Sequence, residues 1–211
     1  MIPYNKYRYI YPPRPEINLP SSELVKYDNG LWAGQPKLNG SNITIFTNGT
    51  ELHIYNRHNS PLTNVKMDSK EFLSLHRGKG WFVLNGEYMN KAKSDENRQE
   101  FNHKFVIFDI LAYENDYLVG QSFQQRIELL DSIYGKVDSE KEYLYSITTN
   151  VYRVKTYEIG FKELFDKITP IDMVEGLVMK RKTAKLEIGT SELNNVKSQL
   201  KCRKPTKNYK Y

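Results

Sequence analysis

The stretch that decides the fold is Gln35-Pro36-Lys37-Leu38-Asn39-Gly40-Ser41-Asn42, followed by Ile43-Thr44-Ile45-Phe46 and the turn Thr47-Asn48-Gly49-Thr50. The alternation of apolar and polar residues predicts a strand, and the Asn-Gly pair predicts a hairpin turn. Lys37 should therefore lie at a corner between strand and loop. Neighbouring cations or burial could leave part of its amine unprotonated and nucleophilic. By itself, a K-x-x-G sequence is more often an ordinary turn lysine, so the rest of the chain must decide.

The composition is typical of a soluble domain of generous size. The chain has 211 residues, of which 39% are hydrophobic, and its mean hydropathy is -0.66. Because no window reaches the roughly 18 apolar residues of a membrane span and no signal peptide is recognisable, we expect a cytoplasmic protein without a membrane partner. The single cysteine, Cys202, excludes an internal disulfide and a cysteine-based zinc cluster.

The charge balance favours a polyanionic partner. Lys and Arg number 31 against 25 Asp and Glu, which gives a net charge of +6, and the pI is near 9.1. Sixteen tyrosines could stack on bases, although tyrosines also fill the faces of sheets. Nucleic acid is therefore the partner that the composition favours.

Both ends of the chain have distinctive sequences. We interpret residues 1–30 as an N-terminal arm in which Pro12-Pro13-Arg14-Pro15 imposes an extended polyproline segment. Arg14 could contact a phosphate, or the arm could simply be a packed strap. Residues 205–211 form a basic tail. No linker is long enough to divide the chain, so we expect a single domain over residues 1–211.

Three apolar runs each carry one carboxylate. Residues 81–89 contain Glu87, residues 105–111 contain Asp109, and residues 174–180 contain Glu175. Each run is expected to be a buried strand, and a carboxylate inside such a strand needs a partner. We therefore expect the acids to converge on a site, although coincidence is an alternative. Helices are predicted to begin near Ser21 and to cover residues 68–75, 122–133 and 161–168.

Cations complete the set. Lys180 ends the third of these strands, Lys201 and Arg203 alternate on a strand at residues 198–205, and Arg57 follows the strand that returns from the hairpin. Cations can hold phosphates, carboxylates can hold a divalent metal, and a lysine can replace pyrophosphate at the α-phosphorus of a nucleotide. The chain lacks the G-x-x-x-x-G-K-[ST] sequence of a P-loop enzyme.

Six short motifs occur in a fixed order: K-x-N-G-x-N, N-R, N-G-E-Y, F-x-x-F-D-I, E-G-L-V-M-K and L-K-C-R. In this order they resemble the collinear motifs of the covalent nucleotidyltransferases, which include ATP-dependent polynucleotide ligases and mRNA capping enzymes. Asn42 resembles an asparagine typical of the RNA ligase 2 branch. The resemblance implies an α+β fold, a nucleotidyltransferase (ATP-grasp-like) domain with two antiparallel sheets around a nucleotide groove and helices outside.

The resemblance also implies roles for individual residues. Lys37 would form a lysyl-AMP intermediate, and Arg57 would contact the nucleotide and the 5'-phosphate. Glu87 would bind the ribose, and Phe108, at the end of its strand, would stack on adenine. Glu175 would help to bind the catalytic metal, either Mg²⁺ or Mn²⁺. Three cations, Lys180, Lys201 and Arg203, would bind the α-phosphate and orient the departure of pyrophosphate.

Some positions depart from the family pattern. Asn39 and Asn42 would also contact the nucleotide, but Asn39 stands where ligases usually have Asp or His. Arg203 replaces a lysine. Gln35 stands where many DNA ligases have a glutamate that accepts from adenine; a glutamine can accept too, but it can also donate to guanine, so ATP is expected without excluding GTP. The sequence shows neither the OB-fold domain of DNA ligases and capping enzymes nor the C-terminal domain of RNA ligase 2. Either the N-terminal arm and the tail hold the substrate, or a partner protein supplies the missing clamp.

These features predict an ATP-dependent RNA ligase. It would transfer AMP from Lys37 to a 5'-phosphate and seal that end to a 3'-hydroxyl, most naturally in the repair of nicked or broken RNA. A minimal DNA ligase and a non-catalytic nucleic-acid-binding relative are the alternatives, and the intact charged positions argue against the latter. The proline-rich arm suggests a phage or viral source.

Overall fold

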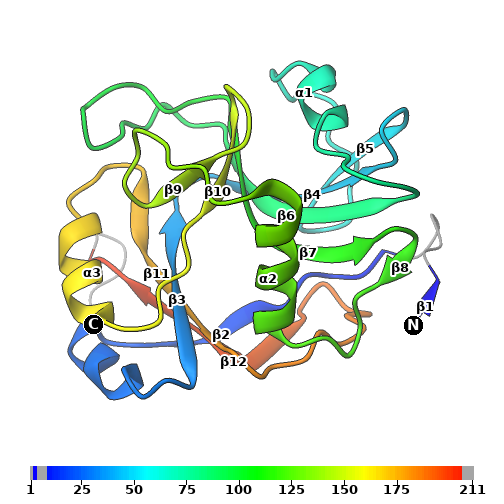
Figure 1. Cartoon of the computed structure of the whole chain (residues 1–211). Coiled ribbons are helices and arrows are strands. Elements are labelled where there is room, and N and C mark those ends of the chain that lie inside the picture. Colours follow the sequence, from blue (N-terminus) through cyan, green and yellow to red (C-terminus); the bar gives the residue numbers. More distant parts are fainter. Residues whose placement is uncertain (1, 4–8, 206–211) are drawn as a thin grey trace.

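The computed structural model describes residues 2–3 and 9–205. Two β-sheets lie on either side of a groove, and the helices pack on the outside of the sheets (Figure 1). The α+β class predicted from the sequence is confirmed. Of the basic tail predicted at residues 205–211, all but Pro205 lies outside the described residues.

Within the described residues, the larger sheet has eight strands. Six of them follow the order β1-β8-β7-β6-β4-β5, while β10 pairs with β7 and β9 pairs with β10. Their bounds are β1 Ile2–Pro3, β4 Ser41–Thr47, β5 Leu52–Asn56, β6 Phe82–Met89, β7 Lys104–Tyr113, β8 Asp116–Tyr117, β9 Leu144–Ser146 and β10 Val151–Val154. The hairpin predicted at Asn48-Gly49 joins β4 to β5, and Gly49 has a φ of +90° that suits glycine.

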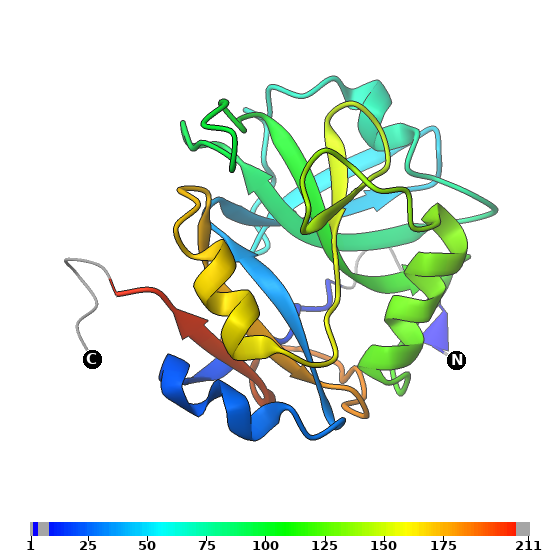
Figure 2. The ribbon, with the colours of Figure 1, turned by 60° about the vertical axis from the view of Figure 1, so that its left-hand side comes forward.

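The smaller sheet has four strands in the order β2-β12-β11-β3, again counted within the described residues. The bounds are β2 Arg14–Asn18, β3 Trp32–Leu38, β11 Val174–Arg181 and β12 Asn195–Arg203. The arm segment predicted as polyproline thus contributes an edge strand, β2, a position where proline is tolerated. Figure 2 shows this sheet with strands from both the beginning and the end of the chain.

The prediction of two antiparallel sheets was wrong in one respect. Most strand pairs are antiparallel, but β10 runs parallel to β7 and β12 runs parallel to β2, so both sheets are mixed. A parallel pair needs a long connection between its strands. Helix α2 (Phe123–Tyr134) lies in the connection from β7 to β10, and most of the chain separates β2 from β12.

The helices begin and end close to the predicted residues. Asp68 caps α1 (Ser69–Leu73), and Ser122 forms a capping box with Gln125 at the start of α2. Helix α3 spans Phe161–Ile168, as predicted. The helix expected near Ser21 is a 3₁₀ helix, η1 (Ser21–Tyr27).

Two hydrophobic cores fix the sheets in place. One packs α2 and α1 against the larger sheet, and Phe123, Ile127 and Leu130 of α2 are buried in it, as their spacing predicted. The other packs α3 against the smaller sheet. No helix in the described ranges is long and apolar enough to cross a membrane.

Candidate active site

A groove of about 700 Å³ lies between the two sheets. Every predicted site residue except Asn39 lines it: Gln35, Lys37, Asn42, Arg57, Glu87, Phe108, Glu175, Lys180, Lys201 and Arg203. The backbone of Asn39 donates to the carbonyl of Met173 (2.9 Å), and its side-chain oxygen accepts from Lys91 Nζ (3.4 Å). The expectation that Asn39 faces the nucleotide is therefore not supported by its position.

Strand register explains why the cations of the smaller sheet share one face. Lys37 of β3 is opposite Gly176 of β11, which is opposite Arg203 of β12. Two residues along, Val178 is opposite Lys201. Because paired residues point to the same side of a sheet and alternate residues along a strand do so too, Lys37, Lys201 and Arg203 all face the groove.

Lys37 lies one residue before the end of β3. Its Nζ forms a hydrogen-bonded ion pair with Glu175 Oε2, and Arg203 Nε lies 3.7 Å from the same oxygen. We had expected uncharged or cationic surroundings for this amine. Instead, a carboxylate stabilises the charged ammonium, so Lys37 must lose a proton before it can attack an electrophile.

Two glycines allow the strands to approach closely around Lys37. Gly176 has a φ of +149°, and a Cβ there would lie 1.9 Å from the carbonyl oxygen of Cys202. A Cβ at Gly40 would lie 2.4 Å from the carbonyl oxygen of Tyr88. The glycines of the K-x-N-G and E-G motifs are therefore required by the spacing of the backbone.

Glu87 lies on β6, across the groove from the smaller sheet. Its Oε1 accepts from the backbone N–H of Gly40 (3.0 Å). Burial raises the pKa of Glu87 to about 7, although the Lys37 ammonium and the Gly40 hydrogen bond oppose this shift. A carboxyl with this pKa can be protonated or ionised near neutral pH, so it can either donate to or accept from a hydroxyl.

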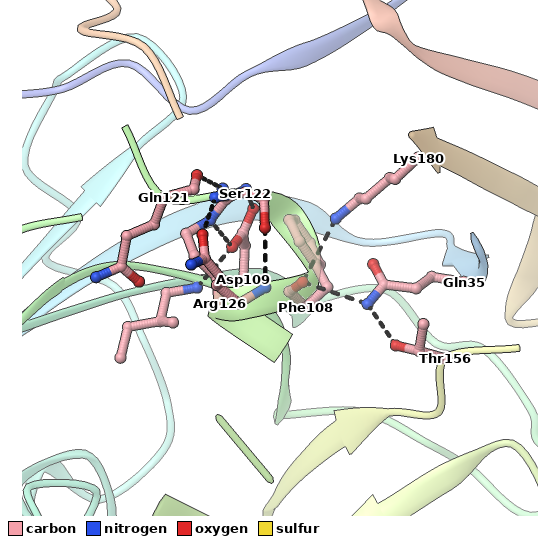
Figure 3. A network of polar contacts seen from close by, with 10 residues as sticks. Gln35, Phe108, Asp109, Gln121, Ser122, Arg126, Thr156 and Lys180 are labelled. Carbon is pink, nitrogen blue, oxygen red and sulfur yellow. Dashed lines mark hydrogen bonds and ion pairs between the residues drawn. The ribbon is translucent and has the colours of Figure 1, made fainter. Parts of the chain in front are cut away.

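The closed end of the groove contains Gln35, Phe108 and Lys180 (Figure 3). Gln35 Nε2 donates to Thr156 Oγ1 (3.0 Å) and to the carbonyl of Phe108 (3.4 Å). Its buried Oε1 has no hydrogen-bond partner among the described residues. Both donors of the amide are thus engaged, and an acceptor remains.

Lys180 belongs to this closed end and not to the cations around Lys37. Its buried Nζ lies 3.4 Å from the Phe108 carbonyl oxygen and about 5 Å from the centres of the Phe108 and Phe123 rings. Burial lowers the pKa of Lys180 to about 8, with Asp109 opposing the shift and Arg126 adding to it. This position does not support the expected role on the α-phosphate. Phe108 itself lies in the middle of β7, not at its end.

Asp109 does not converge with the other acids, contrary to our expectation. Arg126 of α2 donates to both of its carboxylate oxygens (2.8 and 2.9 Å), and both side chains are buried. Figure 3 shows this pair beside the Lys180 and Phe108 contacts. Arg126 holds the pKa of Asp109 below its usual range despite burial. The pair attaches α2 to β7 and so has a structural role.

The open end of the groove carries Arg57 on one side and Arg14 on the other. Arg57 Nε donates to His58 Nε2 (2.9 Å), and His58 Nδ1 bonds to the Glu192 carboxylate. Arg14 Nη1 donates to the Glu192 backbone carbonyl (3.3 Å). On β12, next to the strand of Arg14, Lys201 Nζ donates to the carbonyl of Pro15 (3.4 Å). Burial, Arg203, Lys37 and Arg14 together lower the pKa of Lys201.

Asn42 lies on β4, beside β6. Its Nδ2 donates to the Gly86 carbonyl (3.4 Å), and its Oδ1 accepts from Asn85 Nδ2 (3.3 Å). These contacts hold the Asn42 side chain between β4 and the Glu87-bearing strand.

Sequence reasoning missed Asn85, Thr156 and Glu192. Thr156 follows a strand, β10, that no sequence pattern had indicated, and Glu192 lies in a connection without a motif.

Among the described residues, a divalent cation would find no ready-made cage of ligands. The described residues contain no group of three or more His, Cys, Asp or Glu side chains that could hold a metal ion. Glu175, the predicted metal ligand, is paired with Lys37. Mg²⁺ is commonly held by one or two carboxylates together with substrate phosphates, so Glu175 fits a metal that arrives with a nucleotide.

Comparison with known proteins identifies the family. The family model described as RNA ligase matches residues 30–198. This range includes all the motifs named above except L-K-C-R at residues 200–203. The chain belongs to the RNA ligase family. A search of curated proteins found no match.

This RNA ligase family chain also has a fold similar to that of solved DNA ligase structures. It matches a mycobacterial DNA ligase D in complex with ATP and MES (TM-score 0.60, 16% identity, 92% of this chain and 60% of the other). The ligase domain of M. tuberculosis LigD matches with a TM-score of 0.64 and 14% identity over 93% of this chain and 61% of the other. A Lig E DNA ligase matches with a TM-score of 0.57 and 15% identity over 92% and 70%.

These similarities show the fold alone, and the chain spans about 60% of the length of the two ligase D structures. The predicted resemblance to covalent nucleotidyltransferases is therefore confirmed for family and fold. The roles of individual residues and the substrate are taken up below as proposals.

Proposed function

We propose that this protein is an ATP-dependent RNA ligase in which Lys37 carries AMP. The observation that carries the proposal is the position of Lys37 in a groove beside Glu175, with Lys201 and Arg203 on the same sheet face. A nucleophile, a carboxylate and phosphate-binding cations are the groups that transfer of a nucleotidyl group needs.

In the first step, the unprotonated amine of Lys37 attacks the α-phosphorus of ATP. A nitrogen–phosphorus bond forms, and the bond from the α-phosphorus to the bridging oxygen breaks, so pyrophosphate leaves with the electron pair. Glu175 is placed to accept the proton that the ammonium must lose. Lys201 and Arg203 stabilise the charge on the phosphate oxygens. A Mg²⁺ or Mn²⁺ ion, held by Glu175 directly or through water, would neutralise further phosphate charge.

The closed end of the groove favours adenine as the base. Gln35 uses its amide donors internally and leaves Oε1 as an acceptor. An acceptor suits the amino group of adenine and disfavours the carbonyl oxygen of guanine. Phe108 offers a ring on which the base can stack, and Glu87 is placed to bind the ribose. The ATP found in the mycobacterial DNA ligase D structure also supports ATP over GTP.

In the second and third steps, AMP passes from Lys37 to a 5'-phosphate and is then displaced by a 3'-hydroxyl, which seals the strand. Arg57, at the open end, is placed to contact the 5'-phosphate. The net charge of +6 suits a nucleic-acid substrate. The family match favours RNA, and repair of nicked or broken RNA in a cytoplasmic, phage-encoded setting is the proposed role.

The test is a label transfer assay with intact mass. Incubation with ATP and Mg²⁺ should add one AMP to the wild-type protein and none to Lys37→Ala. A matched control, Lys26→Ala, removes an exposed lysine whose ion pair with Glu23 lies within its own turn, and this variant should label normally. Labelled Lys37→Ala protein would refute the assignment of the nucleophile. GTP in place of ATP should give no adduct.

A DNA ligase is the second candidate, because the structural neighbours reported above are DNA ligases. Nicked RNA and nicked DNA duplexes, added separately to the adenylylated protein, distinguish the two. Discharge of AMP on RNA and not on DNA would support the proposal. An adduct that neither duplex discharges would indicate that a partner protein supplies a clamp. Absence of any adduct would favour a non-catalytic nucleic-acid-binding protein.

A further inference from the structure

Arg14 is a cation of the groove that no motif of the sequence includes. It lies on β2, the edge strand of the smaller sheet, where the N-terminal arm pairs in parallel with β12. Its side chain is half-buried and lines the groove. The hydrogen bond from Arg14 Nη1 to the Glu192 carbonyl fixes one end of the guanidinium and leaves its other donors for a ligand.

Two cations are held close together here without a counter-ion. Lys201 Nζ reaches the carbonyl of Pro15, the residue next to Arg14. The charge of Arg14 contributes to the lowered pKa of Lys201. Neither Arg14 nor Lys201 forms an ion pair with a carboxylate anywhere in the described ranges 2–3 and 9–205. Two like charges kept together without a paired carboxylate are expected to bind an anion.

The order of the strands indicates which anion Arg14 and Lys201 would bind. From the nucleophile outward, the smaller sheet runs β3 with Lys37, β11 with Glu175, β12 with Lys201 and Arg203, and β2 with Arg14. Neighbouring strands are about 5 Å apart, so Lys201 lies about two strand widths and Arg14 about three strand widths from the strand of Lys37. In phosphoryl transfer the attacking and leaving atoms lie in line across the phosphorus. A leaving group displaced by Lys37 therefore moves toward β12 and β2.

We propose that Arg14 binds the pyrophosphate of ATP as it leaves in the first step. This inference rests on the proposed function. The α-phosphate would lie between Lys37 and Lys201, and the β- and γ-phosphates would extend toward Arg14 at the open end of the groove. The arm would thus take part in lysine adenylylation, and it would have no role once AMP is on Lys37, because the later steps release no pyrophosphate.

The experiment separates the steps of the reaction. The rate of adduct formation on Lys37 is measured for wild type, Arg14→Ala, Arg14→Lys and the control Arg181→Ala. Arg181 is an exposed arginine of the same sheet that follows Lys180, and its side chain therefore points to the opposite face. We expect Arg14→Ala to form the adduct about 100-fold more slowly, Arg14→Lys to recover part of the rate, and Arg181→Ala to match wild type.

Two further measurements identify the ligand of Arg14. Added pyrophosphate should discharge the adduct of Arg14→Ala more slowly than that of wild type, by a similar factor. Sealing of a nicked RNA duplex that already carries the 5'-adenylyl group should proceed at the wild-type rate, since no pyrophosphate takes part.

Three results would overturn the inference or its basis. Adduct formation by Arg14→Ala at the wild-type rate would refute the role of Arg14 alone. Slow sealing of the adenylylated duplex by Arg14→Ala would assign Arg14 to a phosphate of the nucleic acid instead. Absence of an adduct on the wild-type protein would refute the proposed function itself.

Discussion

At the scale of single residues, Glu87 and Asp109 show how the surroundings of two similar carboxyl groups shift their pKa values in opposite directions. Each is one acid in an apolar strand, and nothing in the local sequence distinguishes them. In the structure Asp109 has a buried arginine partner and a lowered pKa, whereas Glu87 has a backbone N–H donor, the nearby charge of Lys37 and a raised pKa. The difference is set by Arg126, which comes from a helix that follows both strands.

Glu87 should make the stability of the protein depend on pH. Its pKa is about 7 in the folded protein against 4.5 for an ordinary glutamate. Between these values the folded state binds more protons than the unfolded state, so the free energy of unfolding falls as the pH rises through this window. Glu87→Gln removes the effect. As the pH rises from about 4.5 to about 8, the free energy of unfolding of the variant should increase by about 1 to 3 kcal/mol relative to that of wild type.

Urea denaturation of both proteins at the two pH values measures this gain. Glu96→Gln is a matched control, because the Glu96 carboxylate does not line the groove and instead accepts from Tyr143. A difference between Glu87→Gln and wild type that stays constant with pH would contradict the raised pKa.

Most residues of the site could be predicted from the sequence, because their types and order are tied to chemistry. What the sequence could not supply was the partner of each residue. The sequence predicts Lys180 as one of several phosphate-binding cations, yet in the structure it is buried near the Phe108 and Phe123 rings at the closed end of the groove. Asn39 has the right place in its motif, but Lys91 and the Met173 carbonyl bind it from outside the groove.

At the scale of elements, the pair of strands β11 and β12 brings Glu175 beside the cations of β12. Gly176 permits this pairing, since a Cβ would lie 1.9 Å from the Cys202 carbonyl oxygen. Gly176→Ala must push the two strands apart. We expect a loss of about 3 kcal/mol or more in the free energy of unfolding, together with loss of adduct formation on Lys37.

Gly120→Ala is the control for this prediction. Gly120 also has a positive φ, +88°, but a Cβ there meets nothing within 4 Å. Gly120→Ala should lower the free energy of unfolding by only about 1 to 2 kcal/mol, which is the strain of placing an alanine in this backbone conformation. Equal losses in the two variants, measured by urea denaturation, would show that contact with Cys202 is not the cause.

Elements with clear local signals were predicted closely, and those without them were missed. Capping residues and apolar spacing located α1, α2 and α3 to within a few residues. The short strands β9 and β10 lack alternation over a useful length, and β10 depends on pairing with the distant β7. The parallel direction of β2 was also unpredictable, because its partner β12 is about as far away in sequence as the chain allows.

At the scale of the whole molecule, the net charge of +6 should appear as a salt dependence of nucleic-acid binding. The logarithm of the binding constant for a nicked RNA duplex should fall linearly with the logarithm of the salt concentration. Arg57→Ala should reduce the slope by about 1, because it removes one phosphate contact. Arg181→Ala, on the far face of the smaller sheet, should leave the slope unchanged.

Fluorescence anisotropy with a labelled duplex over a range of salt concentrations measures these slopes. Equal slopes for wild type and Arg57→Ala would mean that Arg57 does not contact a phosphate. A slope near zero for wild type would remove the electrostatic argument for a nucleic-acid substrate.

The smaller sheet also has a consequence for synthesis. Strand β3, with Lys37, is made early, yet its neighbour in the sheet is β11, and β2 is paired by β12. Both partners are among the last described residues to leave the ribosome. Lys37 therefore gains its neighbours in the sheet only after β11 and β12 have been translated. Slow folding through these long-range pairs is expected, and a ribosome that stalls before residue 174 would release a chain in which Lys37 has no carboxylate beside it.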